Sequence, residues 1–469
     1  MPRDPSNRSP KLPTMSNKKP VRLGLNVLAS GRHDAAWKTL PDAAKLPTDI
    51  DTFVRIAQLA ERGKIDALFL ADGPGGLVPE AYERPWRAFD PVALNAALSQ
   101  ATHHIGLVVT TTSLFGHPHT VARQISSLDH LSKGRAAWNI ITSQAPVALA
   151  AYGFDKGFEQ QQRYERAGEF TEIVTGLWDS FPWDAVVADP QSGVFVDPAK
   201  LHPIDVQGRH FKAAGALSLP TSPQGRPVIF QAGDSEDSKA FGARWADALF
   251  TGQRLLEKGQ NFYADVKALA RGHGRNPDHL LVVPGLFPIL GGTQAEARRR
   301  KDELDEGLDH TALREELARH LALEPEDLPF DEPLPFDKIE QAESRVPLAA
   351  RWRRREMIKV LDEARRHRWT VRQTLRDNLT GGHRVVVGTP EQVAANIVHW
   401  VDSGAADGFN LNIDVQTDGL EAVVDHLIPA LQKAGRFRRD YEGTTLRENL
   451  GLPLYRTEAN RRRADALAA

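Results

Sequence analysis

An asparagine in the middle of an apolar segment is the first residue of this chain that points to chemistry. Asn139 lies within AlaAlaTrpAsnIleIleThrSer, residues 136–143, directly after a Gly134-Arg135 turn. The segment is typical of a buried parallel strand, where a side-chain amide costs free energy unless it is hydrogen-bonded. Asn139 therefore needs a partner, which is either a core side chain or a polar ligand.

Polar residues also end two other apolar runs. Asp72 follows residues 66–71, and Thr110 opens a row of four hydroxyl residues, 110–113. In a barrel of parallel strands, active sites are built at the carboxyl ends of the strands. The alternatives are that Asp72 is a turn residue before glycine and that the hydroxyls satisfy the loop backbone. The residues alone leave both interpretations open.

Two predicted helix starts offer groups that suit an anion. Gly233 and Ser235 follow the apolar run 227–232, and the free backbone N–H groups of a helix start bind anions. Arg163 and Tyr164 add a guanidinium and a phenol near another helix start. The alternative for 234–237 is an acidic first turn that complements the helix dipole.

The histidines of this chain do not form a recognisable metal site. His33 and the pair His117 and His119 each follow an apolar run, but no carboxylate stands at ligand spacing and HisGluXXHis is absent. Cys is absent as well, which excludes disulfides, thiolate metal ligands and cysteine nucleophiles. We therefore predict no metal. Neither a P-loop nor a GlyXSerXGly segment is present.

The composition is that of an ordinary globular protein. Of 469 residues, 41% are hydrophobic, and the formal net charge of -2 gives no general attraction to nucleic acid or anionic membranes. No apolar run approaches the roughly 18–20 residues of a membrane span, and the basic run 351–355 is typical of a solvated helix face. Absence of Cys fits a reducing compartment, so we expect a cytoplasmic protein. Residues 1–20 lack the apolar core of a secretion signal and are predicted to be a disordered extension, with Met15 as an alternative start.

Short apolar runs alternate with helical patterns along the chain, which predicts βα units. Eight such runs favour a (β/α)8 barrel over a doubly wound sheet, and no GlyXGlyXXGly follows the first run. Thr389 with Gln392 and Thr293 with Glu296 predict capped helix starts, and apolar spacing predicts a helix from Tyr164. The expected strands are 21–27, 66–71, 104–111, 136–142, 227–232, 247–251, 280–289 and 408–413.

Two long insertions interrupt the alternation. Residues 182–226 are rich in Pro, Gly and Asp, and residues 294–385 are charged and helical. Insertions into a barrel usually lie over its catalytic face, so we expect 294–385 to act as a lid. Peripheral decoration is the alternative. Residues 436–469 form a C-terminal extension to the expected barrel of residues 21–435.

Taken in their order along the chain, several segments of this sequence resemble those of the bacterial luciferase-like flavin monooxygenases. The resemblance is to the branch that contains nitrilotriacetate, dibenzothiophene-sulfone and long-chain alkane monooxygenases. It spans roughly residues 21–435, and the whole ordered set carries it rather than any one motif. The matching segments are 33–37 (HisAspAlaAlaTrp), 66–72, 121–143, 163–170 (ArgTyrGluArgAlaGlyGluPhe), 177–181, 224–236 and 386–394.

The resemblance implies that reduced FMN binds at the carboxyl-terminal end of the barrel. Two departures from the family pattern stand out: Gln160 replaces a common His, and Asp234 replaces a small neutral residue where a carboxylate would repel phosphate unless it points away. His33 is expected to face the substrate as a proton donor or orienting group. The isoalloxazine and ribityl groups are expected near Asp72, Thr110, Asn139 and Ser143, and the phosphate near Gln160, Arg163, Tyr164, Gly233 and Ser235.

The resemblance further implies a two-component monooxygenase. Reduced FMN would come from a separate NAD(P)H:flavin reductase, which fits the missing dinucleotide motif, and one oxygen atom of dioxygen would enter the substrate. Relatives oxidise aminopolycarboxylates, organosulfur compounds or alkanes, and the sequence does not choose among these classes. A homodimer or dimer of dimers is expected. The alternatives are a deazaflavin-dependent oxidoreductase of the same superfamily and a non-catalytic flavin-binding protein.

Overall fold

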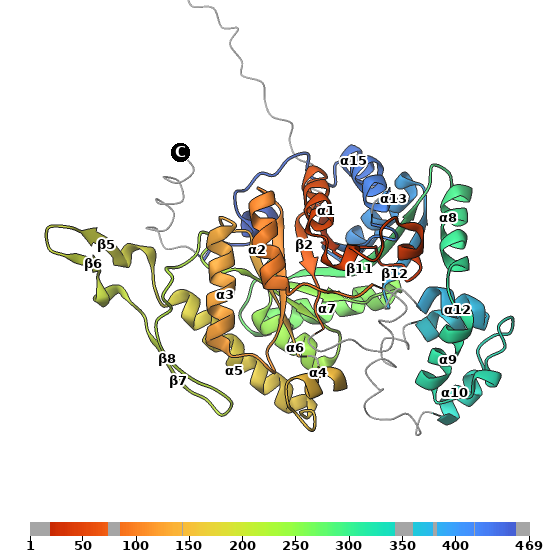
Figure 1. Ribbon diagram of the computed structural model, residues 1–469, viewed down its shortest axis with the longest axis horizontal. Helices are drawn as coiled ribbons and strands as arrows, with labels where there is room; N and C mark the ends of the chain where they lie inside the picture. The colour runs from red at the N-terminus through yellow and green to blue at the C-terminus, as the bar shows by residue number, and fades with distance from the viewer. Residues whose placement is uncertain are drawn as a thin grey trace, which may run out of the picture.

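Eight parallel strands close into a barrel (Figure 1). The computed structural model describes residues 19–73, 85–142, 144–342, 360–378, 382–416 and 418–455. Pairing runs from β1 through β2, β3, β4, β9, β10 and β11 to β13, which pairs with β1 again. The predicted barrel is confirmed, because a doubly wound sheet would leave two open edges. The barrel strands are β1 (Arg22–Asn26), β2 (Ala67–Leu70), β3 (Gly106–Thr112), β4 (Ala136–Ile141), β9 (Val228–Ala232), β10 (Ala248–Thr251), β11 (Leu281–Leu290) and β13 (Gly408–Asn412).

Each barrel strand is buried on both faces, as its near-continuous apolar sequence predicts. Along β3, Leu107 and Val109 pack in the large core beneath the helices, while Val108 belongs to a smaller core inside the barrel. Successive side chains of a strand point to opposite faces, so Thr110 faces inward with Val108. The same alternation directs Asn139 of β4 inward and Trp138 outward.

Helices surround the barrel and begin at the residues that the sequence marks. Thr389 with Gln392 and Thr293 with Glu296 both form complete capping boxes, as predicted. The helix predicted from Tyr164 is present and starts four residues earlier. The surrounding helices are α1 (Ile50–Arg62), α2 (Pro91–Ala101), α3 (Pro118–Leu131), α4 (Pro146–Ala151), α5 (Gln160–Asp179), α6 (Glu236–Trp245), α7 (Leu256–Gly272), α13 (Pro390–Asp402), α14 (Asp418–Ala422) and α15 (Ile428–Lys433).

The insertion 294–385 forms a helical unit with a core of its own, beside the barrel at the right of Figure 1. Its core includes Leu317, Leu321, Ile339 and Leu375, and none of these belongs to the two cores of the barrel. The strand β12 (Arg384–Gly388), which the sequence did not predict, returns the chain to the barrel along the second half of β11. The basic run 351–355 lies outside the described residues. The helices are α8 (Gln294–Glu306), α9 (His310–Leu321), α10 (Phe336–Ala342) and α12 (Val371–Asn378).

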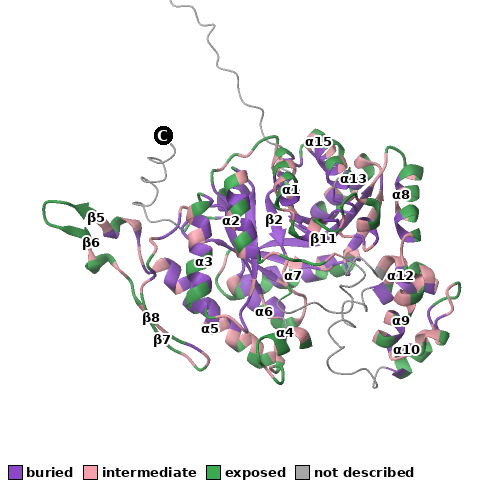
Figure 2. Ribbon diagram, viewed as in Figure 1, coloured by how far each residue is buried: buried purple, intermediate pink, exposed green. Residues whose placement is uncertain are grey.

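The insertion 182–226 forms two antiparallel hairpins on the opposite side. The first pairs β5 (Val186–Asp189) with β6 (Val194–Val196), and the second pairs β7 (Ile204–Gln207) with β8 (Lys212–Gly215). The first hairpin projects from the body and is largely exposed (Figure 2).

Residues within 436–455 close the amino-terminal end of the barrel, which we call the base. Leu446 and Leu450 of α16 (Leu446–Leu450), with Leu452, pack in the barrel's inner core. Arg447 is 1% exposed and bonds Asp247 at the start of β10 at 2.6 Å. With the base filled, the carboxyl-terminal end, which we call the mouth, is the end left for a ligand. None of the helices in the described ranges combines the length and apolar character that a membrane span requires.

Candidate functional site

Asn139 and Thr110 lie opposite each other inside the barrel near the mouth. Asn139 Nδ2 donates to Thr110 Oγ1 at 3.0 Å, and both side chains are 2% exposed. Asn139 Oδ1 accepts no hydrogen bond from the described part of the chain. A buried polar atom left in this state costs about 1–3 kcal/mol. Thr110 therefore accepts the hydrogen bond of the Asn139 amide nitrogen. The amide oxygen of Asn139 suits a ligand that donates a hydrogen bond.

A second amide pair joins the neighbouring strands β1 and β13. Asn26 Nδ2 donates to Asn412 Oδ1 at 2.8 Å, while Asn26 Oδ1 is unsatisfied within the described ranges. Sequence reasoning missed this pair, although Asn410 and Asn412 are spaced by two residues and so share the inward face of their strand. The inner wall near the mouth is thus polar, whereas the wall near the base is apolar.

Asp72 lies just beyond the end of β2 and is half-buried. Burial raises the pKa of Asp72 above its ordinary value, and the Gly73 amide and the Arg87 guanidinium offset this only in part. A carboxyl that takes up a proton more readily than usual can hold or release one at the mouth. Ser143, the fourth residue expected around the rings, lies outside the described residues.

The starts of α5 and α6 lie side by side. Gln160 Nε2 donates to Asp237 Oδ2 in the first turn of α6, and the ring of Tyr164 lies 5.8 Å from that of Phe241. Arg163 Nη1 donates to the carbonyl oxygen of Thr142 at the end of β4, at 3.0 Å. The structure therefore brings the predicted anion-binding residues of both helices to one side of the mouth.

The turn into α6 requires glycine at position 233. Gly233 has a φ of 142°, and a Cβ there would lie 2.3 Å from Ser238 Oγ. Ser235 caps the helix, because its Oγ accepts from the Ser238 amide at 3.3 Å. Asp234 is half-buried in the same turn. Glycine at 233 thus makes room for the chain's own Ser238, and the start of α6 presents backbone N–H groups of the kind that bind an anion.

His33 is held between the β1 loop and the helical insertion. Its Nδ1 accepts from the Ala35 amide at 3.2 Å, so its Nε2 carries the proton and donates to Asp305 Oδ1 at 3.2 Å. Asp305, in α8, also accepts from Lys301 Nζ at 2.6 Å. Burial opposes ionisation of Asp305, but the hydrogen bonds from His33 and Lys301 lower the pKa of its carboxyl below the ordinary value. Asp305 is 272 residues from His33, and no sequence pattern links the two.

Arg254, just after β10, fastens the insertion to the barrel. Its guanidinium bonds Glu363 and Asp377, and it donates to the carbonyl oxygen of His383 at 2.7 Å. Burial raises the pKa of Asp377, the Glu363 charge adds to this, and Arg254 opposes it. The buried cation therefore stabilises two carboxylates that would otherwise repel each other.

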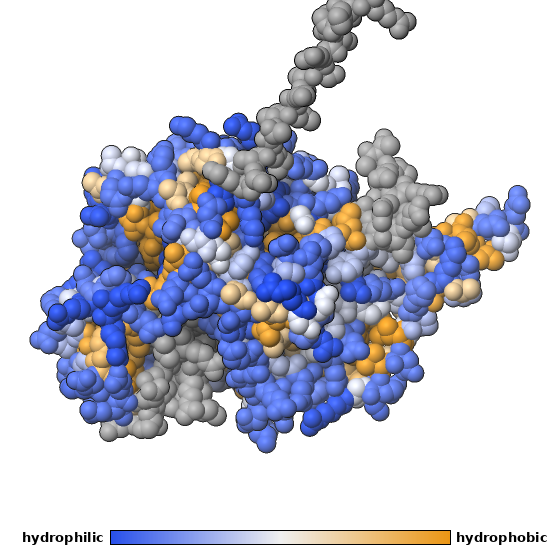
Figure 3. Space-filling view, turned by 180° about the vertical axis from the view of Figure 1, so that it is seen from behind, coloured by the Kyte–Doolittle hydropathy of each residue, from blue (hydrophilic) through white to orange (hydrophobic). Residues whose placement is uncertain are grey.

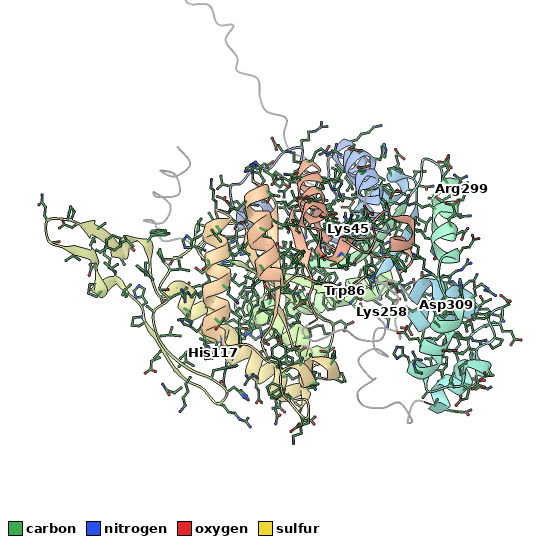
Figure 4. All side chains as sticks on the ribbon, viewed as in Figure 1. Lys45, Trp86, His117, Lys258, Arg299 and Asp309 are labelled. Atoms are coloured by element: carbon green, nitrogen blue, oxygen red, sulfur yellow. The ribbon has the colours of Figure 1, made fainter. Side chains whose placement is uncertain are left out.

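The starts of α3 and α9 lie on opposite sides of the molecule, where His117 and Asp309 are labelled in Figure 4. His117 Nδ1 accepts from the His119 amide at 3.3 Å and thus caps α3. Among the residues that the structure describes, no group of three or more His, Cys, Asp or Glu could hold a metal ion.

The chain is similar over most of its length to several monooxygenases. Residues 25–407 match the family model described as luciferase-like monooxygenase. The N-acetyl-S-(2-succino)cysteine monooxygenase of Bacillus subtilis (strain 168) is 39% identical over 93% of this chain and 98% of its own. Nitrilotriacetate monooxygenase component A of Aminobacter aminovorans is 37% identical over 93% of this chain and 98% of its own length. The solved EDTA monooxygenase of Chelativorans sp. BNC1 superposes with a TM-score of 0.76, at 37% identity, over 93% of this chain and 99% of its own.

Proposed function

The chain belongs to the luciferase-like monooxygenase family, and from this premise we propose that it is the oxygenase component of a two-component system that uses reduced FMN and dioxygen. A separate NAD(P)H:flavin reductase supplies the reduced FMN. One oxygen atom enters a small organic substrate. The protein works in the cytoplasm as a homodimer or dimer of dimers.

The unsatisfied Oδ1 of Asn139 is the observation that carries this proposal. It lies in a buried polar wall at the mouth, where a flavin ring edge with N–H groups would satisfy it. The residues of this wall fit the ring, and the starts of α5 and α6 fit a phosphate. Asp72, Thr110, Asn139 and Ser143 would hold the ring and ribityl groups, and Gln160, Arg163, Tyr164, Gly233 and Ser235 the phosphate.

The protein's own residues orient the substrate and exclude water. When bound, reduced FMN supplies the electrons that activate dioxygen. His33, fixed in one tautomer by Asp305, presents a defined ring orientation at the mouth. The helical insertion, fastened by Arg254, shields the reacting groups from solvent.

Polycarboxylates are the first substrates to test among the aminopolycarboxylate, organosulfur and alkane classes. The support is that two of the similar proteins carry the names of nitrilotriacetate and EDTA in their activities. Both compounds carry several carboxylates on a small flexible frame.

Anaerobic titration of the purified protein tests the cofactor. Reduced FMN should bind at least about tenfold more tightly than reduced riboflavin, because riboflavin lacks the phosphate and its charge-assisted hydrogen bonds. Quenching of the protein's tryptophan fluorescence measures both affinities. Equal binding of the two flavins would remove the phosphate site from the proposal.

Turnover with an added flavin reductase tests the reaction. With a substrate of the right class, oxygen consumption should yield a product that contains one labelled atom from 18O2. Hydride transfer from a reduced deazaflavin without oxygen uptake would contradict the proposal and identify the protein as a deazaflavin-dependent oxidoreductase. Tight flavin binding with no turnover across the substrate panel would leave only a flavin-binding protein.

A further inference from the structure

His383, near the end of the helical insertion, turns into the barrel. Its imidazole fills the space beside Gly285 of β11, where a Cβ would collide with the ring. The ring lies 5.2 Å from that of Phe250, which lies 5.4 Å from the ring of Phe69. Phe69 belongs to the inner core of the barrel, and Phe250 packs against it. The imidazole of His383 therefore lies inside the ring of strands.

The neighbouring residue supports this direction. Arg384 opens β12, and its guanidinium lies 4.1 Å from the ring centre of Trp400 and 5.4 Å from that of Phe409. Both rings belong to the large core beneath the helices. Successive side chains of an extended segment point to opposite faces, so His383 points inward. The insertion otherwise presents a largely hydrophilic surface to solvent, at the left of the molecule seen from behind in Figure 3.

His383 lies toward the mouth of the barrel. Thr251 ends β10 and pairs with Pro284 of β11, so Gly285 and the imidazole beside it lie just beyond the carboxyl end of β10. In the closed ring of eight strands, β11 lies four strands from β3. His383 is thus on the side of the barrel opposite Thr110. It is half-buried, which leaves part of the side chain accessible to a ligand.

Arg254 holds the backbone of His383 in place. Its Nη1 donates to the carbonyl oxygen of His383 at 2.7 Å, and the same buried guanidinium bonds Glu363 and Asp377 of the insertion. Gly382, with a φ of 77°, turns the chain immediately before His383. The position of the imidazole is therefore coupled to the contact that fastens the insertion.

We propose that His383 contacts the substrate at the mouth, through a hydrogen bond between its imidazole and a polar group of the substrate, and that Arg254 positions it for this contact. Both β1 and β11 flank β13, so His33, which follows β1, lies on the same side of the mouth. The two histidines face the substrate from this side, and the wall of Thr110 and Asn139 is left to the flavin. The inference rests on the proposed oxygenase function and adds a residue that selects the substrate.

The surroundings of His383 fit such a contact. Ligand sites combine apolar and aromatic walls with a few polar groups that fix the orientation of the ligand. Phe250 and Phe69 supply an aromatic wall beside the imidazole. The carbon frame of a substrate packs on this wall, while the imidazole bonds its polar group.

Steady-state turnover with an added flavin reductase tests the contact. With a substrate that yields 18O-labelled product, His383→Phe should raise KM about three- to tenfold, the loss expected for one hydrogen bond, at nearly unchanged kcat. His383→Gln keeps a hydrogen-bonding group and should restore much of the lost affinity. Both variants should bind reduced FMN as the wild type does. His426→Phe, at an exposed position outside the barrel, is the matched control and should leave KM unchanged.

A double-mutant cycle tests the positioning role of Arg254. In Arg254→Met the carbonyl oxygen of His383 loses its donor, so adding His383→Phe should raise KM by less than about twofold. A full, additive effect would remove Arg254 from the proposal.

The outcomes separate this inference from the proposed function. If the wild type forms labelled product, an unchanged KM in His383→Phe would overturn the substrate contact alone. A raised KM accompanied by loss of FMN affinity would do the same, because it would assign His383 to the flavin. A wild type that forms no labelled product from any of the three substrate classes would overturn the proposed function, and this inference with it.

Discussion

Buried asparagine side chains line the inside of the barrel near its mouth. Apolar side chains would pack there without the free-energy cost of burying an unsatisfied polar atom. Asn139 and Asn26 each keep an oxygen unsatisfied within the described residues near the mouth, while Val108 and Phe230 fill the barrel closer to the base. Each such atom costs about 1–3 kcal/mol. A free-energy cost of this size at one end of the barrel is consistent with a polar ligand that forms the missing hydrogen bonds when it binds.

Asn139→Ala should weaken binding of reduced FMN about three- to tenfold, because one hydrogen bond is worth roughly 0.5–1.5 kcal/mol. Its free energy of unfolding should change by less than about 1 kcal/mol, since the variant also removes an unsatisfied oxygen. Fluorescence titration and urea unfolding measure the two effects. Asn95→Ala is the control, because Asn95 is equally buried but lies in α2 and bonds the backbone of Val108. A collapse of stability with FMN affinity retained would make Asn139 a core residue instead.

The helical insertion is an element that folds around its own core and joins the barrel through polar contacts. Those contacts include the Arg254 clamp, the His33–Asp305 bond and the Arg300–Asp414 ion pair, beside a small apolar cluster of Ala36, Leu304 and Val415. An interface that depends largely on polar contacts can open at a lower free-energy cost than a continuous apolar core. A lid over the mouth must be able to open in this way.

Arg254→Met should loosen the contact between the helical insertion and the barrel. Removal of one partner of a buried ion pair typically costs about 3–5 kcal/mol, and without the cation the pKa of Asp377, already raised by burial, should rise further. Amide hydrogen exchange should then quicken in 310–342 and 371–378 but not in β1 to β4. Arg365→Met is the matched control, because its pair with Glu340 is exposed and worth about 0–1 kcal/mol. Equal exchange in both variants would show that Arg254 does not hold the insertion.

Stability and ligand binding are separated along the axis of the whole molecule. The base is sealed by residues from the far end of the chain, through Leu446, Leu450 and the buried Arg447–Asp247 pair. The amide oxygens of Asn139 and Asn26, which are unsatisfied within the described residues, lie toward the mouth. A barrel closed at one end can therefore keep a costly polar wall at the other.

Leu450→Ala should lower the free energy of unfolding by about 2–5 kcal/mol, because it opens a cavity in the inner core. FMN affinity should be unchanged, since the residue lies at the base. Calorimetry and flavin titration check the two statements. Leu269→Ala, on the exposed face of α7, should stay within about 0.5 kcal/mol of wild type. Loss of flavin binding in a folded Leu450→Ala protein would contradict the separation of the two ends.

The sequence by itself determined the eight strands, the capped starts of α8 and α13 and the need of Asn139 for a partner. These features depend on alternation, capping and burial over a few residues, so they are visible locally. Only the tertiary structure decided that Thr110 satisfies half of Asn139, that Asp305 fixes His33 and that Arg254 clamps the insertion. The His33 and Arg254 contacts join residues more than a hundred positions apart, and their geometry follows from how the barrel closes and where the insertion packs against it.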